Sequence, residues 1–221
     1  MRFGVLGTGM VGQAIAGKLV ELGHETMMGS RRAGNAKATA WASEAGGLGL
    51  EGSFAEAAMH GEMLVNATSG VASLEALDAA GAGNLAGKVL IDVANPLDFS
   101  KGMPPTFSVC NTDSLAEQIQ RTFPEARVVK TLNTVNAAVM VDPGLVPGEH
   151  NVFICGNDDG AKASVSQLLA AFGWPAGNVI DIGDISGARA TEMYLALWLR
   201  LLQKAGTAQL NVEVHVASQT G

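Results

Sequence analysis

A glycine-rich turn near the N-terminus constrains the fold of this chain more than any other feature. The turn reads Gly7-Thr8-Gly9-Met10-Val11-Gly12, directly follows the apolar run 3–6 and opens the helix-length segment 11–22. The first glycine permits a tight turn, the second lets the backbone approach a pyrophosphate, and the third lets the helix pack closely on the strand. Free N–H groups at the helix N-terminus favour an anion there. This setting predicts that the turn binds a dinucleotide through Gly7, Thr8, Gly9, Met10, Val11 and Gly12; the alternative is a glycine-rich turn with no ligand.

Short apolar runs alternate with Ala-rich segments of helical length along most of the chain. The runs of strand length end at Gly, Ser, Asn or Pro residues, and they cover residues 3–6, 25–28, 63–67, 88–94 and 127–131. Residues 11–22 and 114–122 have the apolar spacing of helices, and Asp113 or Ser114 is the expected N-cap of the second one. Alternating strands and helices are typical of a parallel sheet covered on both faces. We therefore predict an α/β fold with a Rossmann-type doubly wound parallel sheet.

The second part of the chain is expected to extend this sheet. Residues 1–150 are the predicted dinucleotide-binding Rossmann domain, and residues 151–221 are a predicted small C-terminal α/β extension. The extension contains two strands, one helix and a long last helix, with the first three at residues 152–155, 179–182 and 159–172. Four apolar residues then alternate with polar ones as in a half-exposed strand, at Leu210, Val212, Val214 and Val216. Residues 218–221 are expected to fray.

The charge and composition of the chain exclude several classes of partner. Its 221 residues carry a formal net charge of −7 and a pI near 5.0, with no basic surplus for nucleic acid or an anionic membrane. The longest apolar stretch, residues 193–202, is too short to span a membrane and contains Arg200. Two cysteines, Cys110 and Cys155, are too few for a disulfide framework. Because glycines also interrupt any signal-like apolar run near the N-terminus, we expect a cytoplasmic protein.

The residues at the end of the second predicted strand indicate which dinucleotide is bound. An NAD enzyme usually places Asp or Glu there to accept the ribose 2′-hydroxyl, whereas this chain has Gly29-Ser30-Arg31-Arg32. A hydroxyl and a guanidinium offer charge-assisted hydrogen bonds to a 2′-phosphate. The sequence therefore favours NADP, held by Ser30, Arg31 and Arg32, over the alternative of solvated surface arginines.

No side chain stands out as a proton donor for reduction of an alcohol, imine or hydroxy acid. The histidines are scattered, and the single tyrosine, Tyr194, falls in an apolar helical stretch where core packing is expected. The acidic run 157–160 precedes an Ala-rich helix, so we interpret it as an N-cap cluster and predict no metal site. When both reactants are redox cofactors, proximity and orientation are the main demands on the protein. We therefore predict no catalytic side chain.

Six stretches of the sequence carry a family resemblance: GTGMVG, GHETMMGSRR, IDVANPL, VVKTLNTVNA, CGNDDGAKASV and DIGDISGARATEMY. Together they resemble the F420-dependent NADP oxidoreductases over nearly the whole chain. The resemblance implies hydride transfer between NADP and the deazaflavin coenzyme F420, with residues 151–221 completing the pocket of the second cofactor. It implies that the NADP 2′-phosphate contacts Thr8, Ser30 and Arg31. Loops with Thr68, Ser69, Asn95 and Pro96 would flank the cofactor, and the segment 133–137 would lie beside both rings, with contacts from Asn133, Thr134 and Ala137.

One departure from this family concerns the second cofactor. Archaeal members tend to have Leu-His-Thr-Ile-Pro-Ala where this chain has Leu132-Asn133-Thr134-Val135-Asn136-Ala137. The Asn-Thr-Val form also resembles the cytosolic NADPH-binding domain of membrane ferric reductases, which pass electrons to a flavin. An asparagine amide hydrogen-bonds to a ring but does not titrate usefully, so Asn133 is not expected to transfer protons. The second redox partner is therefore left open among F420, FMN, FAD and a small substrate in place of a conventional cofactor.

Other functions share the glycine-rich turn. Imine reductases and hydroxyacid dehydrogenases usually add a large helical domain, and the roughly seventy residues after the long loop are too few for one. A non-catalytic NADP sensor would bind the dinucleotide through the same turn. A ring-sized apolar pocket beside the nicotinamide would favour an enzyme, and a closed surface would favour a sensor. The apolar residues of the last helix fit either a homodimer contact or burial within one subunit, and they include Met193, Leu195, Leu197, Trp198, Leu201 and Leu202.

Overall fold

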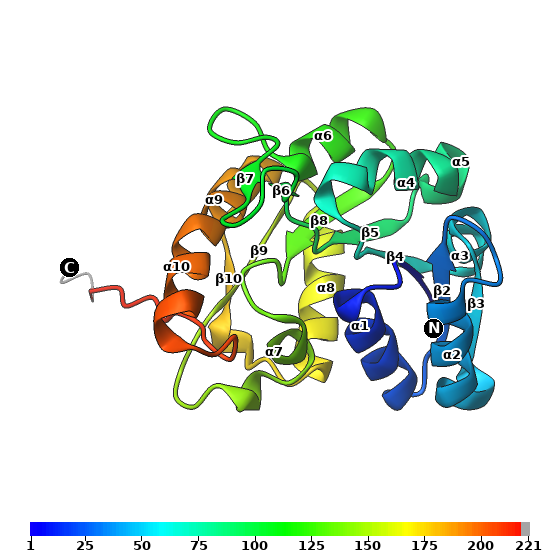
Figure 1. Ribbon diagram of the computed structural model, residues 1–221, viewed down its shortest axis with the longest axis horizontal. Helices are drawn as coiled ribbons and strands as arrows, with labels where there is room; N and C mark the ends of the chain where they lie inside the picture. The colour runs from blue at the N-terminus through cyan, green and yellow to red at the C-terminus, as the bar shows by residue number, and fades with distance from the viewer. Residues whose placement is uncertain (218–221) are drawn as a thin grey trace.

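A twisted eight-stranded sheet with helices on both faces forms the body of the protein (Figure 1). The computed structural model describes residues 1–217. The strand order is β10-β9-β8-β5-β4-β1-β2-β3. These strands comprise β1 (Arg2–Leu6), β2 (Glu25–Ser30), β3 (Gly49–Ser53), β4 (Met63–Asn66), β5 (Val89–Asp92), β8 (Arg127–Thr131), β9 (Val152–Gly156) and β10 (Val179–Asp181). A separate antiparallel pair is formed by β6 (Leu97–Asp98) and β7 (Thr106–Phe107).

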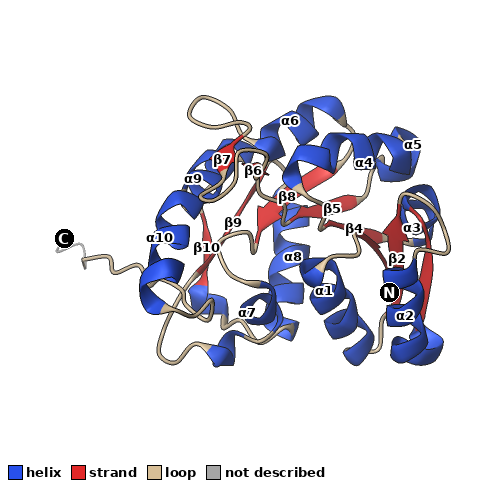
Figure 2. Cartoon of the chain, viewed as in Figure 1, coloured by secondary structure: helices blue, strands red, loops and turns tan. Residues whose placement is uncertain are grey.

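Helices connect most of these strands and cover the sheet from either side (Figure 2). They are α1 (Met10–Glu21), α2 (Ala36–Ala45), α3 (Phe54–His60), α4 (Ser73–Ala80), α5 (Ala82–Leu85), α6 (Leu115–Thr122), α7 (Ala137–Val141), α8 (Asp159–Ala171), α9 (Ala188–Met193) and α10 (Leu195–Ala205). The arrangement confirms the predicted α/β fold of Rossmann type.

Strand direction divides the sheet into two parts. The six strands from β3 to β8 run parallel, and β9 runs antiparallel to β8 while pairing in parallel with β10. The carboxyl ends of the six parallel strands therefore lie at one edge of the sheet. Strand order reverses at β1, which lies between β2 and β4, and such a switch point is where open α/β sheets bind ligands.

The hydrophobic core has one cluster on each side of the sheet. Neighbouring residues of a strand point to opposite faces, so Val5 packs in the cluster below α1 and α8 while Leu6 packs in the cluster below α3, α4 and α6. Met63 and Val65 likewise face one cluster, and Leu64 faces the other. Burial on both faces explains why these strands are continuous apolar runs rather than alternating ones.

Side-chain caps fix the starts of several helices. Ser114 caps α6 through its hydroxyl, which accepts from Glu117 N at 3.2 Å, so Ser114 and not Asp113 is the N-cap. Asp113 instead forms an ion pair with Arg121 at 2.8 Å. Asp158 caps α8 by accepting from Ala161 N at 2.7 Å, which confirms the predicted N-cap role of the acidic run 157–160.

Three parts of the fold differ from the sequence-based expectation. The edge strand β3 and the pair β6–β7 were not predicted, because β3 is short and contains two glycines and the pair has two residues per strand. The expected strand at 210–216 is wrong: Val212 and Val214 bond only with Asn151, at 2.9 and 2.7 Å, so no ladder forms. The expected fraying at 218–221 lies outside the described residues.

The last helix is divided rather than continuous. It consists of α9 and α10, which meet at Tyr194. In α10, Leu195 is buried and Leu197 is 54% exposed, so one face packs on the protein while another is open. Within residues 1–217 no helix has both the length and the apolar character to cross a lipid bilayer.

Candidate functional site

The glycine-rich turn joins β1 to α1, and two of its glycines are required by close packing. Gly7 has a φ of +121°, and a Cβ there would lie 2.5 Å from the carbonyl oxygen of Ala67. A Cβ at Gly12 would lie 2.1 Å from the carbonyl oxygen of Gly7. At Gly9, by contrast, a Cβ would meet no atom within 4 Å. The turn is thus tightly packed at Gly7 and Gly12. At Gly9 it is open, so a ligand could approach the protein backbone there.

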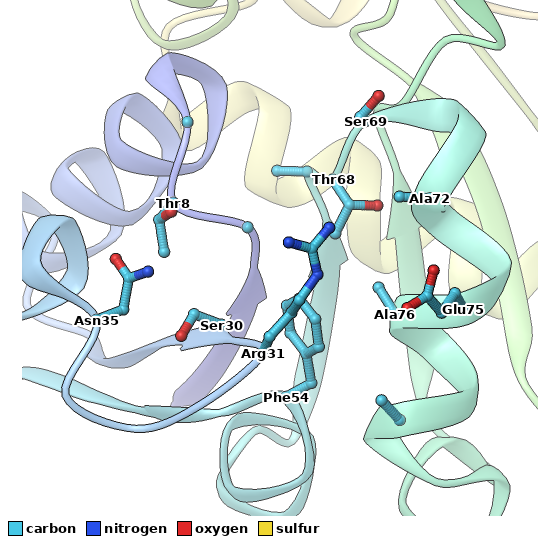
Figure 3. Close-up of a pocket in the computed structure, with 14 residues that line it drawn as sticks. Thr8, Ser30, Arg31, Asn35, Phe54, Thr68, Ser69, Ala72, Glu75 and Ala76 are labelled. Atoms are coloured by element: carbon cyan, nitrogen blue, oxygen red, sulfur yellow. The ribbon is translucent and has the colours of Figure 1, made fainter.

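A first cavity of about 480 Å³ adjoins this turn. It lies between the turn, the end of β2 and helix α4 (Figure 3). Its lining residues are Gly7, Thr8, Gly9, Ser30, Arg31, Asn35, Phe54, Ala67, Thr68, Ser69, Ala72, Glu75, Ala76 and Ala79. The structure therefore brings together the two segments that the sequence singled out for dinucleotide and 2′-phosphate binding.

The polar groups after β2 are positioned by local hydrogen bonds. Ser30 is buried, and its hydroxyl donates to the carbonyl oxygen of Arg32 at 2.6 Å. The Asn35 side chain caps α2 by accepting from Lys37 N at 3.0 Å. Arg31 extends from the end of β2 toward Thr68 (Figure 3), and no carboxylate within the described residues pairs with it. Its guanidinium is thus available to an anion in the first cavity.

A second cavity of about 560 Å³ adjoins the first and shares Ala67, Thr68 and Ser69 with it. Five segments contribute to its wall, which is lined by Met10, Val11, Ala67, Thr68, Ser69, Gly70, Val93, Ala94, Asn95, Leu97, Phe99, Asn133, Thr134, Val135, Asn136, Ala137, Met140, Leu195, Trp198 and Leu199. None of these lining residues is Asp, Glu, His, Cys, Tyr, Lys or Arg. The wall is mainly apolar and has no side chain that titrates near neutral pH.

A reciprocal pair of amides joins two parts of this wall. Asn95 Nδ2 donates to the carbonyl oxygen of Asn133, and Asn133 Nδ2 donates to Asn95 Oδ1, both at 2.9 Å. Leu132, just before Asn133, has a φ of +61°, which is uncommon for a residue other than glycine. This backbone conformation turns the chain after β8 so that Asn133, only 2% exposed, meets Asn95.

A buried ion cluster lies behind the second cavity. Lys130 Nζ is 2.8 Å from Asp92 Oδ2 and 2.9 Å from Glu192 Oε1, and it also donates to the carbonyl oxygen of Ala94. Burial acts to lower the pKa of Lys130, but the two carboxylates outweigh it and raise that pKa above its ordinary value. Burial raises the pKa of Glu192 despite the neighbouring ammonium. Sequence reasoning missed this cluster, whose only signal is a charged residue within an apolar strand, as in Val128-Val129-Lys130.

The predicted binding residues are distributed over both cavities. The first cavity is lined by Gly7, Thr8, Gly9, Ser30, Arg31, Thr68 and Ser69, and the second by Met10, Val11, Thr68, Ser69, Asn95, Asn133, Thr134 and Ala137. Gly12, Arg32 and Pro96 line neither one. Sequence reasoning missed Phe54 in the first cavity and five apolar residues of the second: Phe99, Met140, Leu195, Trp198 and Leu199. The four histidines and Tyr194 also line neither cavity.

No metal centre is evident in residues 1–217, where no three or more His, Cys, Asp and Glu side chains gather as ligands. In the acidic run, Asp158 is engaged as a cap and Asp159 lies 3.2 Å from Lys162. Lys162 also contacts Asp181 at 2.8 Å. These carboxylates are thus occupied by a helix terminus and an ammonium group.

Comparison with known proteins identifies the family. The family profile described as NADP oxidoreductase, coenzyme F420-dependent, matches residues 2–96. A candidate F420-dependent NADP reductase from Arthrobacter sp. FB24 has a solved structure that is 52% identical, with a TM-score of 0.91, covering 98% of this chain and 100% of that one. An imine reductase from Bacillus cereus, 17% identical with a TM-score of 0.62 over 93% of this chain and 62% of its own, shares the fold alone.

This chain matches two curated relatives over only part of their own length. The metalloreductase STEAP3 of Rattus norvegicus is 32% identical over 91% of this chain and 37% of its own length. The F420-dependent NADP reductase of Methanocaldococcus jannaschii is 30% identical over 53% of this chain and 52% of its own length. The chain thus spans about a third of the first relative and half of the second. With the 52% identical structure covered in full, the chain belongs to the F420-dependent NADP oxidoreductase family and is an NADP-dependent oxidoreductase.

Proposed function

We propose that this protein transfers a hydride between NADP(H) and a redox ring bound in the second cavity, with F420 as the leading candidate. In one direction, a hydride would pass from NADPH to the deazaflavin or flavin ring, giving NADP⁺ and a reduced ring that takes its proton from solvent; the reverse transfer would start from the reduced ring. The observation that carries this proposal is a ring-sized apolar cavity next to the first cavity, with no titrating side chain in its wall. Such a wall can orient two rings, but it offers no titrating side chain as a proton donor to a carbonyl or an imine.

The first cavity fits the dinucleotide by its shape and charge. Gly7 and Gly12 make the turn tight, and the open position at Gly9 leaves room for a pyrophosphate. Ser30 and Arg31 would hold the 2′-phosphate through a hydroxyl and an unpaired guanidinium. Thr68 and Ser69, which line both cavities, would lie where the two halves of NADP meet.

The second cavity would hold the nicotinamide and the partner ring. Apolar side chains supply most of its surface, and Trp198 offers an aromatic face. Two buried polar atoms of lining residues, Thr134 Oγ1 and Trp198 Nε1, have no hydrogen-bond partner within the described protein. Residues 195–199 support the proposal that the C-terminal extension completes this pocket.

An NADPH-dependent flavin or ferric reductase is the second candidate function. It is favoured by the 32% identity to rat STEAP3 over 91% of this chain and by the Asn-Thr-Val sequence at 133–135. In this case FMN or FAD would occupy the second cavity. A non-catalytic sensor is less well supported, because a sensor does not need an open apolar cavity of about 560 Å³ beside the dinucleotide.

Two further expectations belong to this proposal. A cytoplasmic location is supported by the two free cysteines, Cys110 and Cys155. A homodimer is supported by the exposed apolar residues of the last helices, with Met193 37% and Leu197 54% exposed. Light scattering of the purified protein would measure the oligomeric state, and a monomeric mass would overturn the dimer.

An anaerobic assay tests the proposed reaction. Purified protein is mixed with NADPH and oxidised F420, and bleaching of the deazaflavin band is followed, with FMN and FAD in parallel and NADH as the control donor. We expect rapid bleaching of one ring acceptor with NADPH and little with NADH. Tight NADPH binding without turnover of any ring would contradict the proposal and favour a dedicated substrate or a sensing role.

A further inference from the structure

Three walls of the second cavity each begin a few residues after a member of the buried ion cluster. Asp92 ends β5 and precedes the wall segment 93–99. Lys130 lies near the end of β8 and precedes the segment 133–140. Glu192 lies in α9 and precedes the lining residues 195–199. The ion cluster thus connects β5, β8 and α9 just before the three wall segments, which are far apart in sequence.

Hydrogen bonds continue from the cluster into the cavity wall by two routes. Lys130 donates directly to the carbonyl oxygen of Ala94, a lining residue. On the other side, Asp92 Oδ1 accepts from Asn66 Nδ2 at 2.8 Å, and Asn66 Oδ1 accepts from the Thr68 hydroxyl at 2.7 Å. Thr68 lines both cavities, so this second route reaches the place where they meet.

The cluster is buried and contains one more carboxylate than ammonium groups. The side chains of Lys130, Asp92 and Glu192 are 0 to 2% exposed, and one ammonium faces two carboxylates. Glu192 also accepts from Leu115 N at 2.8 Å and Ala116 N at 3.2 Å at the N-terminus of α6, where the helix dipole favours a negative charge. Buried ion clusters of this kind rarely add stability over well-packed apolar residues, since each charge must be desolvated. A role in fixing geometry accounts for its position behind the cavity.

We propose that Lys130, Asp92 and Glu192 are positioning residues for hydride transfer, which hold the three walls of the second cavity in register. The cluster touches neither cavity directly; it acts through Ala94, Thr68 and α10. The expected fall in kcat depends on the proposed function, because it is measured on the proposed reaction. The structural consequence, loosened walls at 93–99 and 133–140, does not depend on any ligand.

A variant without charges in the cluster tests this role. Lys130→Met combined with Asp92→Asn and Glu192→Gln removes all three charges while retaining volume and most acceptor groups. We expect the dissociation constant of NADPH to change less than about twofold, and kcat with the ring acceptor to fall about 10- to 100-fold, as misplaced reactants require. Amide hydrogen exchange should rise in residues 93–99 and 133–140 and stay unchanged in the turn 7–12. Asp113→Asn, which removes an ion pair on the surface of α6, is the control.

The outcomes distinguish this inference from the proposed function. If the wild-type protein reduces no ring acceptor, the proposed function fails, and hydrogen exchange alone then decides the positioning role. A folded triple variant with wild-type kcat and wild-type exchange at both wall segments would overturn the positioning role. If the triple variant does not fold, Glu192→Gln is measured in the same way, since it keeps the size of the side chain and its acceptor for Leu115 N.

A second inference rests on a different observation, the distribution of unpaired cations. In residues 1–217, six lysine and arginine side chains contact neither a carboxylate within 4.0 Å nor a backbone carbonyl; they are Arg31, Arg32, Lys37, Lys101, Arg200 and Lys204. The first three follow β2, with Arg31 lining the first cavity and Lys37 in α2. Lys101 lies between β6 and β7, and Arg200 and Lys204 lie one turn apart on α10. None of the six lines the second cavity itself, but Arg200 follows the lining residue Leu199.

A groove beside the second cavity contains one of these cations. The groove measures about 170 Å³ and is lined by Pro104, Pro105, Phe107, Ala196, Leu199, Arg200 and Gln203. It shares Leu199 with the second cavity and extends the site along α10. Because the cavity wall is uncharged, any anionic group of a ring ligand must lie outside it. We infer that the groove receives an anionic tail, such as a phosphate, attached to the ring in the second cavity.

Ring acceptors with and without a phosphate test this inference, which rests on the proposed function. Anaerobic kinetics with NADPH are compared for FMN and riboflavin, which share one ring, in the wild type and in Arg200→Gln/Lys204→Gln. We expect a KM for FMN about tenfold below that for riboflavin in the wild type, and no difference in the variant. Arg127→Gln, at the start of β8, is the control. Equal KM values in the wild type, or a difference that persists in the variant, would overturn the groove, whereas reduction of neither ring would overturn the proposed function instead.

Discussion

The two cavities of this protein are built in different ways. The first takes its polar groups from four short stretches, all within residues 7–79: the turn 7–9, the segment 30–35, residues 68–69 and Glu75. The second is assembled from five segments between Met10 and Leu199, and its wall is mainly apolar. Recognition of a phosphate needs a few polar groups on one local backbone, whereas a slot for a planar ring needs surfaces from distant parts of the chain. The first site is therefore local in sequence and the second depends on the whole fold.

Removal of the buried ammonium should have the largest effect. Lys130→Met leaves Asp92 and Glu192 as two buried carboxylates without a counter-charge, so we expect a loss of about 3–5 kcal/mol in the free energy of unfolding. Urea denaturation measures this loss. Arg121→Met removes an exposed ion pair and should cost at most about 1 kcal/mol. Equal losses in the two variants would show that the base of the second cavity does not depend on the cluster.

Changing the polar groups after β2 should affect the first cavity alone. Ser30→Glu with Arg31→Ala places a carboxylate where a 2′-phosphate is expected, so NADPH should bind about 100-fold more weakly while NADH changes little. Isothermal titration calorimetry with both nucleotides measures the difference. Arg32→Ala is the control, because Arg32 lines neither cavity. An equal loss for NADPH and NADH would refute the assignment of the 2′-phosphate site.

Two glycine substitutions distinguish a glycine needed for protein packing from one that leaves room for a ligand. A Cβ at Gly70 would lie 1.9 Å from the carbonyl oxygen of Asn95, so Gly70→Ala should destabilise the protein by about 1–3 kcal/mol and distort the second cavity. A Cβ at Gly9 meets no protein atom within 4 Å, so Gly9→Ala should keep its thermal midpoint and lose NADPH affinity. Thermal unfolding and NADPH titration of both variants test the pair. The reverse pattern would mean that Gly9 does not face the dinucleotide.

Loss of the aromatic surface should affect only the second cavity. Trp198→Leu removes an aromatic face and an indole N–H from the wall, so we expect KM for the ring acceptor to rise about tenfold. The dissociation constant of NADPH should change little. Trp41→Phe, on the helix α2 away from both linings, is the control. A larger effect on NADPH than on the ring acceptor would contradict the assignment of the two cavities.

The smallest effect concerns pH. The second cavity has no titrating side chain, so the rate of hydride transfer should be nearly constant between about pH 6 and 8. Acid sensitivity should come from elsewhere: hydrogen bonds from Arg121 lower the pKa of Asp113 to about 2. Because the folded-state pKa is below the unfolded one, this stabilisation is present above about pH 4 and is lost as the pH falls toward 2. Asp113→Asn should remove a few tenths of a kcal/mol of this acid-dependent stability, since the pair is largely exposed.

Sequence reasoning succeeded where the signal is local. The turn 7–12, the central strands and the caps at Ser114 and Asp158 are each determined by neighbouring residues, and the α/β fold follows from their alternation. The sequence also singled out Ser30 and Arg31 for a 2′-phosphate, and both residues line the first cavity.

Sequence reasoning failed where segments that are distant in the chain meet in the fold. Nothing in the apolar residues Leu195, Trp198 and Leu199 indicates that they face a cavity rather than the core. The contacts of Lys130 with Asp92 and Glu192 span 38 and 62 residues along the chain, and no local pattern records them. The edge strand β3 pairs with β2 although it contains two glycines, and the tail after α10 is held by contacts with Asn151; periodicity predicts neither.

The position of the two cavities along the chain also has a consequence for synthesis. Every residue that lines the first cavity lies between Gly7 and Ala79, whereas the second requires Leu199, which leaves the ribosome 120 residues later. At a translation rate of about 5–20 residues per second, this interval lasts roughly 6–24 seconds. A nascent chain thus has time to fold β1 to β4 and to bind a dinucleotide before α10 exists. The nucleotide would then act as an early ligand of the growing protein and stabilise one half of the sheet before the other is made.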